Sequence, residues 1–79
     1  MSWVVTVLVH ETQTTNVWTR LDAINARSRM DSITETLLSI GWTKSAETIE
    51  LPGIEISHMQ DDTGTKHVSI SAVNAADNL

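Results

Sequence analysis

The 79-residue sequence has no cysteine, no tyrosine and no phenylalanine, and it contains one proline and three glycines. The absence of cysteine excludes a disulfide framework, a cysteine nucleophile and a thiolate metal site. No apolar run approaches the roughly 18 residues that a membrane span requires. All aromatic surface comes from Trp3, Trp18 and Trp42. The composition therefore predicts a small globular domain that does not span a membrane.

Basic residues are also scarce. Five Lys and Arg stand against ten Asp and Glu, which gives a formal net charge of −5. Such a chain is a poor match for the phosphates of nucleic acid. Hydrophobic residues make up 41% and charged residues 19%, a composition that excludes a disordered acidic tail. Since the first residues lack the basic segment of a signal peptide, we expect a cytoplasmic protein.

The first apolar segment, residues 3–10, is rich in valine and predicts a β-strand. Its alternating positions are apolar on both faces. Val4 and Leu8 share the face opposite to that of Val5. Apolar residues on both faces indicate a central strand, or a strand whose second face is covered by a partner.

Residues 17–21 are ambiguous. They are β-prone, but a helix could also begin near Asn16 and kink near residues 25–28. We favour a strand at 17–21, with Asp22 as the N-cap of a helix over about 23–40. The apolar residues that recur at steps of three and four and define this helix are Ala23, Ala26, Met30, Ile33, Leu37 and Ile40.

Gly41 can adopt the left-handed conformation that ends a helix, which would let Trp42 pack back on Leu37. Residues 43–51 then predict a weaker strand, which Pro52 and Gly53 terminate.

The clearest hairpin joins residues 54–60 to residues 65–73 through a turn over 61–64 with Gly64 as the left-handed residue. This turn would pair Met59 with His67 and His58 with Val68. The resulting apolar face would hold Ile54, Ile56, His58, Val68, Ile70 and Ala72, whereas Met59 and His67 would lie on the polar face.

Together these elements predict an α+β fold: an antiparallel sheet of four or five strands with one amphipathic helix on one face. The element order is ββαβββ, or βαβββ if residues 17–21 are helical. We expect one domain over residues 1–73 and a flexible tail over residues 74–79.

Catalytic, cofactor and metal signatures are missing from the sequence. In the expected register His58 and His67 lie on opposite faces and could not share an ion. Asp61 and Asp62 occupy a turn where aspartate is favoured for local hydrogen bonds. There is no G-x-S-x-G motif and no phosphate-binding loop. We therefore assign no catalytic residue, no cofactor and no metal, and lean against an enzyme.

One local pattern points toward nucleic acid. Arg20, Arg27 and Arg29 cluster near Trp18, and an aromatic ring beside arginines can stack on bases. If residues 17–21 form a strand, Trp18 and Arg20 would share its face away from the core. Nucleic-acid binding through these four residues is an alternative hypothesis.

Protein binding has more physical motivation, because one helix can cover only one face of the sheet. The remaining apolar face predicts a homodimer, or a small inhibitor or adaptor on another protein, as in phage and mobile-element accessory proteins. A third hypothesis is a ligand-binding or enzymatic dimer with a pocket between subunits, involving His10 and Glu11. The predicted partner surface consists of Val4, Leu8, Trp18, Arg20, Met59 and His67.

Overall fold

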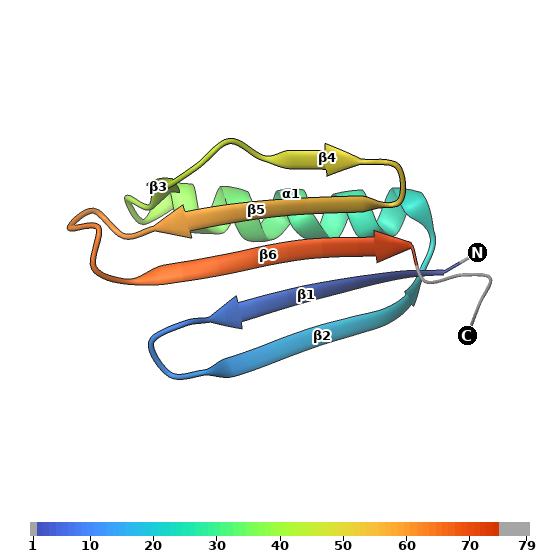
Figure 1. Cartoon of the computed structure of the whole chain (residues 1–79), viewed down its shortest axis with the longest axis horizontal. Coiled ribbons are helices and arrows are strands. Elements are labelled where there is room, and N and C mark those ends of the chain that lie inside the picture. Colours follow the sequence, from blue (N-terminus) through green and yellow to red (C-terminus); the bar gives the residue numbers. More distant parts are fainter. Residues whose placement is uncertain (1, 75–79) are drawn as a thin grey trace.

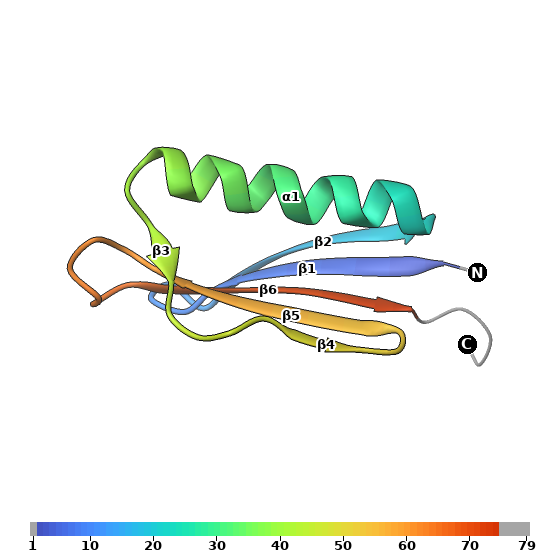
Figure 2. The same ribbon diagram turned by 90° about the horizontal axis from the view of Figure 1, so that it is seen from above.

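The computed structural model describes residues 2–74, which form one helix and six strands. All strand pairs are antiparallel, in the order β2-β1-β6-β5-β3, with β4 also paired to β5. The helix lies across one face of this sheet (Figures 1 and 2). The elements are β1 (Trp3–Val9), β2 (Thr14–Leu21), α1 (Ala23–Ser39), β3 (Thr43–Lys44), β4 (Ile49–Leu51), β5 (Ile54–Gln60) and β6 (His67–Asn74).

The predicted α+β class, with one helix on an antiparallel sheet, is confirmed. The strand count differs, because the order is ββαββββ rather than ββαβββ. The single strand predicted over residues 43–51 is divided into β3 and β4. Both pair with β5, but Lys44 lies opposite Met59 whereas Ile49 lies opposite Ile56, a change of register by two residues. The chain between them therefore bulges out of the sheet.

Residues 17–21 belong to a strand, as we favoured, and the helical alternative is wrong. The strand contains a β-bulge in which Thr19 and Arg20 together oppose Val4, and Arg20 has φ +59°. A bulge adds one residue and changes which side chains face the core. Trp18 consequently packs half-buried against the core, so the prediction that it shares an outer face with Arg20 is wrong.

Both predicted ends of the helix are confirmed. The Asp22 carboxylate accepts the Asn25 N–H at 2.7 Å as the N-cap. At the other end Gly41 has φ +94°, and the Trp42 N–H donates to the Leu37 carbonyl oxygen at 3.0 Å. This is the Schellman pattern, which requires a left-handed residue that glycine adopts without steric cost. It also fixes the direction in which the chain returns to the sheet.

The inner side of the helix follows most of the predicted stripe. Ala26 and Met30 are buried, and Ile33 and Leu37 pack against the core. Ile40 does not, because it is the C-cap residue beyond the last full turn and remains exposed. The buried hydrophobic core between helix and sheet consists of Val5, Val7, Ala26, Met30, Met59, Val68, Ile70 and Ala72.

The β5–β6 hairpin is present, and its loop is organised by Asp61. The Asp61 carboxylate accepts the N–H groups of Thr65 at 2.9 Å and Lys66 at 3.3 Å. The Asp61 N–H in turn donates to the Lys66 carbonyl oxygen at 3.0 Å, and Gly64 has φ +74°. These bonds close a loop over residues 61–66, two residues longer than the predicted turn.

The longer loop shifts the register by one residue from the predicted one. Met59 pairs with Val68 instead of His67. Because side chains alternate along a strand, this shift exchanges the two faces of β5 relative to β6. Met59 therefore lies beneath the helix, and its neighbour His58 lies on the opposite face. The prediction that all six of these residues share one apolar face is therefore wrong. Val68, Ile70 and Ala72 of β6 face the helix, whereas Ile54, Ile56 and His58 of β5 face the other side of the sheet.

Asn74, which we expected to begin the tail, is instead the last residue of β6. Its N–H donates to the Gly53 carbonyl oxygen at 2.8 Å. The remainder of that expectation, residues 75–79, lies outside the described residues.

Candidate functional site

The sheet face opposite the helix carries a continuous set of aliphatic side chains. We call it the open face, because α1 packs on the other side (Figure 2). Its members follow from the strand registers and from the alternation of side chains along each strand. The aliphatic residues of the open face are Val4, Leu8, Val17, Ile49, Leu51, Ile54, Ile56 and Val73.

These aliphatic residues form two flanks, which Val73 of β6 joins at one end and hydroxyl groups separate along the rest of the face. One flank lies on β4 and β5, and the other lies on β1 and β2. Between them β6 contributes Ser69 and Ser71, and β1 contributes Thr6. Within residues 2–74, no Asp, Glu, Lys or Arg occupies a regular ladder position on this face. The bulge is the exception, because Arg20 and Thr19 together oppose Val4 of this face. The regular positions of the face are thus free of formal charge on a chain whose net charge is −5.

At one end of the open face the three histidines gather around Ser69. The Ser69 hydroxyl lies 2.6 Å from His10 Nε2 and 2.9 Å from His58 Nδ1. The rings of His10 and His67 meet edge to face, with their centroids 6.5 Å apart. The prediction that His58 and His67 lie on opposite faces is therefore wrong, because the hairpin register places both on the open face.

Ser69 can serve both imidazoles because a hydroxyl donates one hydrogen bond and accepts others. At most one of the two rings accepts the hydroxyl proton, so at least one ring donates its own N–H to Ser69. A serine beside a histidine is also the first requirement of a nucleophile–base pair. However, β6 lies between β1 and β5 and is hydrogen-bonded on both sides, so its backbone N–H groups are not free to stabilise an oxyanion. Among residues 2–74, no group of three or more histidine or acidic side chains is arranged to hold a metal ion.

Only part of the predicted partner surface lies on the open face. Val4 and Leu8 are half-buried there, and His67 is exposed at its end. Met59 is 0% exposed in the core beneath the helix, so its predicted place on an outer face is wrong. The β4 and β5 aliphatic residues of the open face were missed, because the expected register directed Ile54 and Ile56 toward the helix.

The predicted arginine cluster is divided by the fold. Arg29 lies over the Trp18 ring, with its guanidinium carbon 4.9 Å from the ring centroid. Arg27 instead pairs with Glu55 of β5, and Arg20 is exposed at the β2 bulge. Side chains two positions apart on a helix are rotated by about 200° around its axis, so Arg27 and Arg29 point to different sides. The four residues therefore do not make one surface.

The remaining predicted pair, His10 and Glu11, lies at the β1–β2 loop. His10 contacts Ser69, and the Glu11 carboxylate is 4.0 Å from the Lys66 ammonium. Within residues 2–74 the structure contains no helix with both the length and the apolar composition of a membrane span. Compared with known protein families, curated proteins and solved structures, the chain shows no significant match.

Proposed function

We propose that this chain is a non-enzymatic protein-interaction module, and that its open face binds the open face of a second copy in a two-fold symmetric dimer. The observation that carries the proposal is the aliphatic open face of the sheet, whose regular ladder positions carry no formal charge within residues 2–74. A contiguous apolar face of this kind marks an interaction surface. Two-fold dimers are the commonest assemblies of soluble proteins.

The distribution of charge permits a second copy as the occupant. Each chain has a net charge of −5, and two such chains repel one another through their acidic surfaces. Contact through the open face keeps these acidic residues away from the interface. The hydroxyl groups of Thr6, Ser69 and Ser71 between the aliphatic flanks can hydrogen-bond across it.

Size supports the same arrangement. The two longer dimensions of the molecule are 40 and 22 Å, and they span the sheet in Figure 1. The outline of the molecule in this direction, roughly 900 Å², is of the same order as the 800 Å² or so that a standard interface takes from each partner. A standard interface therefore fits on this side of the molecule, and a charge placed within it is expected to weaken the dimer.

Sedimentation equilibrium over a concentration series tests this proposal. The wild-type chain is expected to dimerise. Ile56→Glu places a carboxylate on the open face and is expected to weaken the dimer roughly a hundredfold or more, because an unpaired charge is then buried. Ile24→Glu is the matched control, since Ile24 is 81% exposed on the helix and away from the open face.

Circular dichroism of both variants checks that the fold survives. A wild-type chain that remains monomeric at the highest concentration contradicts the dimer. Equal weakening by both glutamates places the interface elsewhere and also contradicts the proposal. A stable one-to-one complex of wild-type monomer with another protein would replace the second copy with that partner.

A further inference from the structure

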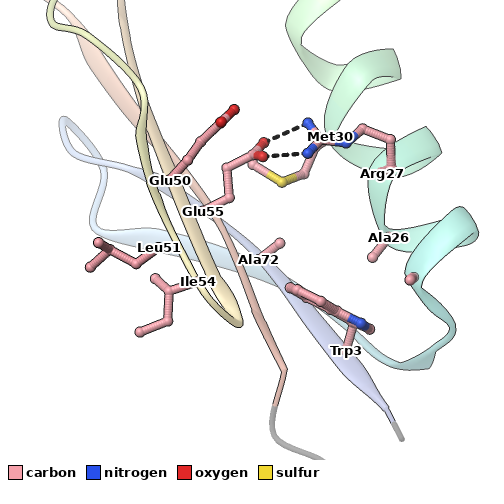
Figure 3. A pocket seen from close by; sticks show the side chains of 10 residues that line it. Trp3, Ala26, Arg27, Met30, Glu50, Leu51, Ile54, Glu55 and Ala72 are labelled. Atoms are coloured by element: carbon pink, nitrogen blue, oxygen red, sulfur yellow. Dashed lines mark hydrogen bonds and ion pairs between the residues drawn. The ribbon is translucent and has the colours of Figure 1, made fainter.

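A groove runs between α1 and the β4–β5 hairpin, on the helix side of the sheet. The helix packs mainly over β1, β6 and β2, which leaves the helix side of β5 less covered. A cavity of about 390 Å³ opens there, between Ala26 and Met30 of the helix and Ala72 of β6 (Figure 3). This volume is within the usual range for small-molecule sites, about 300–1,000 Å³.

The groove has an apolar end and a polar end. Trp3 forms one wall of the apolar end, close to Ala26 and Ala72. A second cavity of about 100 Å³ continues the groove past Arg27 and Glu55, which line both cavities, and reaches Ser57. The groove is therefore amphipathic along its length.

Ser57 provides a polar atom that the fold leaves without a partner. Its side chain is buried, with 4% of the residue exposed, and its hydroxyl has no hydrogen-bond partner among the described residues. Most buried hydroxyls in proteins are hydrogen-bonded, and leaving one unpaired costs free energy. Ser57 lines the polar cavity, and a molecule bound there can supply the missing bond once the buried hydroxyl turns toward it.

The charges around the groove favour a cationic group. Arg27 donates to both carboxylate oxygens of Glu55, one of them at 2.8 Å. Hydrogen bonding to Glu55, together with the charges of Glu55, Asp31 and Glu50, raises the pKa of Arg27 above its ordinary value. Three carboxylates thus act on one guanidinium. The other cation of the polar cavity, Lys44, donates to the Thr48 hydroxyl at 3.1 Å.

Glu50 lines both cavities and makes no ion pair within residues 2–74. It lies directly opposite Glu55 in the β4–β5 ladder, where two like charges repel. Figure 3 shows the Glu50 carboxylate beside that of Glu55, at the polar end of the cavity, with the Trp3 ring at the other end. A ligand ammonium between Glu50 and Ser57 would relieve this repulsion.

We propose that the groove binds a small amphipathic amine, with its ammonium held by Glu50 and the Ser57 hydroxyl and its apolar body on Trp3, Ala26 and Ala72. The ammonium donates hydrogen bonds to both oxygen atoms. The aromatic ring of Trp3 suits a flat apolar group. Glu50 and Ser57 lie on the helix side of the sheet, away from the proposed dimer interface, although Leu51 and Ile54 of the open face also line the cavity.

The experiment uses three probes of similar shape: 2-phenylethylamine, 2-phenylethanol and phenylacetate. Each is titrated into the full-length, isotope-labelled chain and followed by the shifts of backbone amides and the Trp3 indole N–H. The amine is expected to bind roughly tenfold more tightly than the alcohol, because its hydrogen bond to a carboxylate is charge-assisted. Phenylacetate is expected to bind least, since the carboxylates repel it.

Two variants locate the ammonium. Glu50→Gln and Ser57→Ala are each expected to weaken amine binding about tenfold, and Glu50→Gln should leave alcohol binding unchanged. Glu35→Gln is the matched control, because it makes the same charge change on an exposed helix residue outside both cavities. Shifts at Trp3 and Ser57 that saturate at roughly tenfold lower concentrations of amine than of alcohol support the site. No binding of any probe, or equal binding of amine and alcohol, overturns it.

Discussion

The two faces of the sheet are both rich in aliphatic residues, yet the side chains of one face are far more deeply buried than those of the other. On the helix side Val5 and Ile70 are completely buried. On the open face Leu51 is 60% exposed and Val17 is 52% exposed. The residue types are similar, so hydrophobicity alone does not decide burial. The position of the helix decides it, and the open face stays uncovered unless another molecule packs on it.

The largest expected difference between the faces is in core stability. Ile70→Ala should lower the free energy of unfolding by about 2–5 kcal/mol, because it removes buried methyl groups and leaves a cavity. Ile54→Ala on the open face should lower it by less than about 1 kcal/mol at a concentration where the chain is monomeric. Urea unfolding of both variants measures this. Equal losses would show that the open face is covered within the monomer.

A smaller effect is expected where the helix is joined to the sheet. Gly41→Ala places a side chain on a residue with φ +94° and should destabilise the fold by about 1 kcal/mol. It also weakens the hydrogen bond between Trp42 and the end of the helix. This contact helps to hold the helix over its face of the sheet. Ser28→Ala, on the exposed side of the same helix, should cost nothing measurable. Thermal unfolding compares the two, and a neutral Gly41→Ala would contradict the strained helix end.

The ion pair between the helix and β5 should contribute less to the free energy of unfolding than the helix end at Gly41. Arg27→Met should cost roughly 0.5–1 kcal/mol, because the pair is bidentate but Arg27 is largely exposed. The loss should shrink at high salt. Lys66→Met removes a looser surface pair with Glu11 and should change stability by even less. Urea unfolding at two salt concentrations separates them, and equal effects would remove any special role for Arg27.

The finest test concerns the loop that sets the register of both faces. Although desolvation opposes the shift, hydrogen bonds from Lys66, Thr63, Thr65 and Gly64 lower the pKa of Asp61 below its ordinary value of 3.8. The unfolded chain therefore binds this proton first as the pH falls. The ionised Asp61 carboxylate therefore stabilises the folded state fully above pH 3.8. This contribution is lost as the pH falls through the lower pKa that Asp61 has in the folded chain.

Asp61→Asn should remove that part of the acid dependence, and urea unfolding between neutral pH and the acid range measures it. Asp62→Asn leaves the Asp61 hydrogen bonds in place and serves as the control. If both variants retain the full wild-type acid dependence, the Asp61 carboxylate does not stabilise the loop.

The candidate surface was predictable in kind but not in membership. The excess of apolar strand surface over one helix was visible in Val4 and Leu8, and both lie on the open face. Ile56 and Met59 were assigned to the wrong faces. The sequence pattern favours the register that places the apolar residues of both strands on one face and their polar residues on the other. The six-residue loop closed by Asp61 overrides that preference by shifting the register by one residue.

Local signals in the sequence were sufficient for the helix and its ends, because capping by Asp22 and the left-handed Gly41 act within a few residues. They were also sufficient for the β-branched first strand. The strand registers, the bulge at Arg20 and the gathering of the histidines around Ser69 were decided only by the tertiary structure. Each depends on pairing between segments distant in sequence, and a one-residue shift there exchanges whole faces of the sheet.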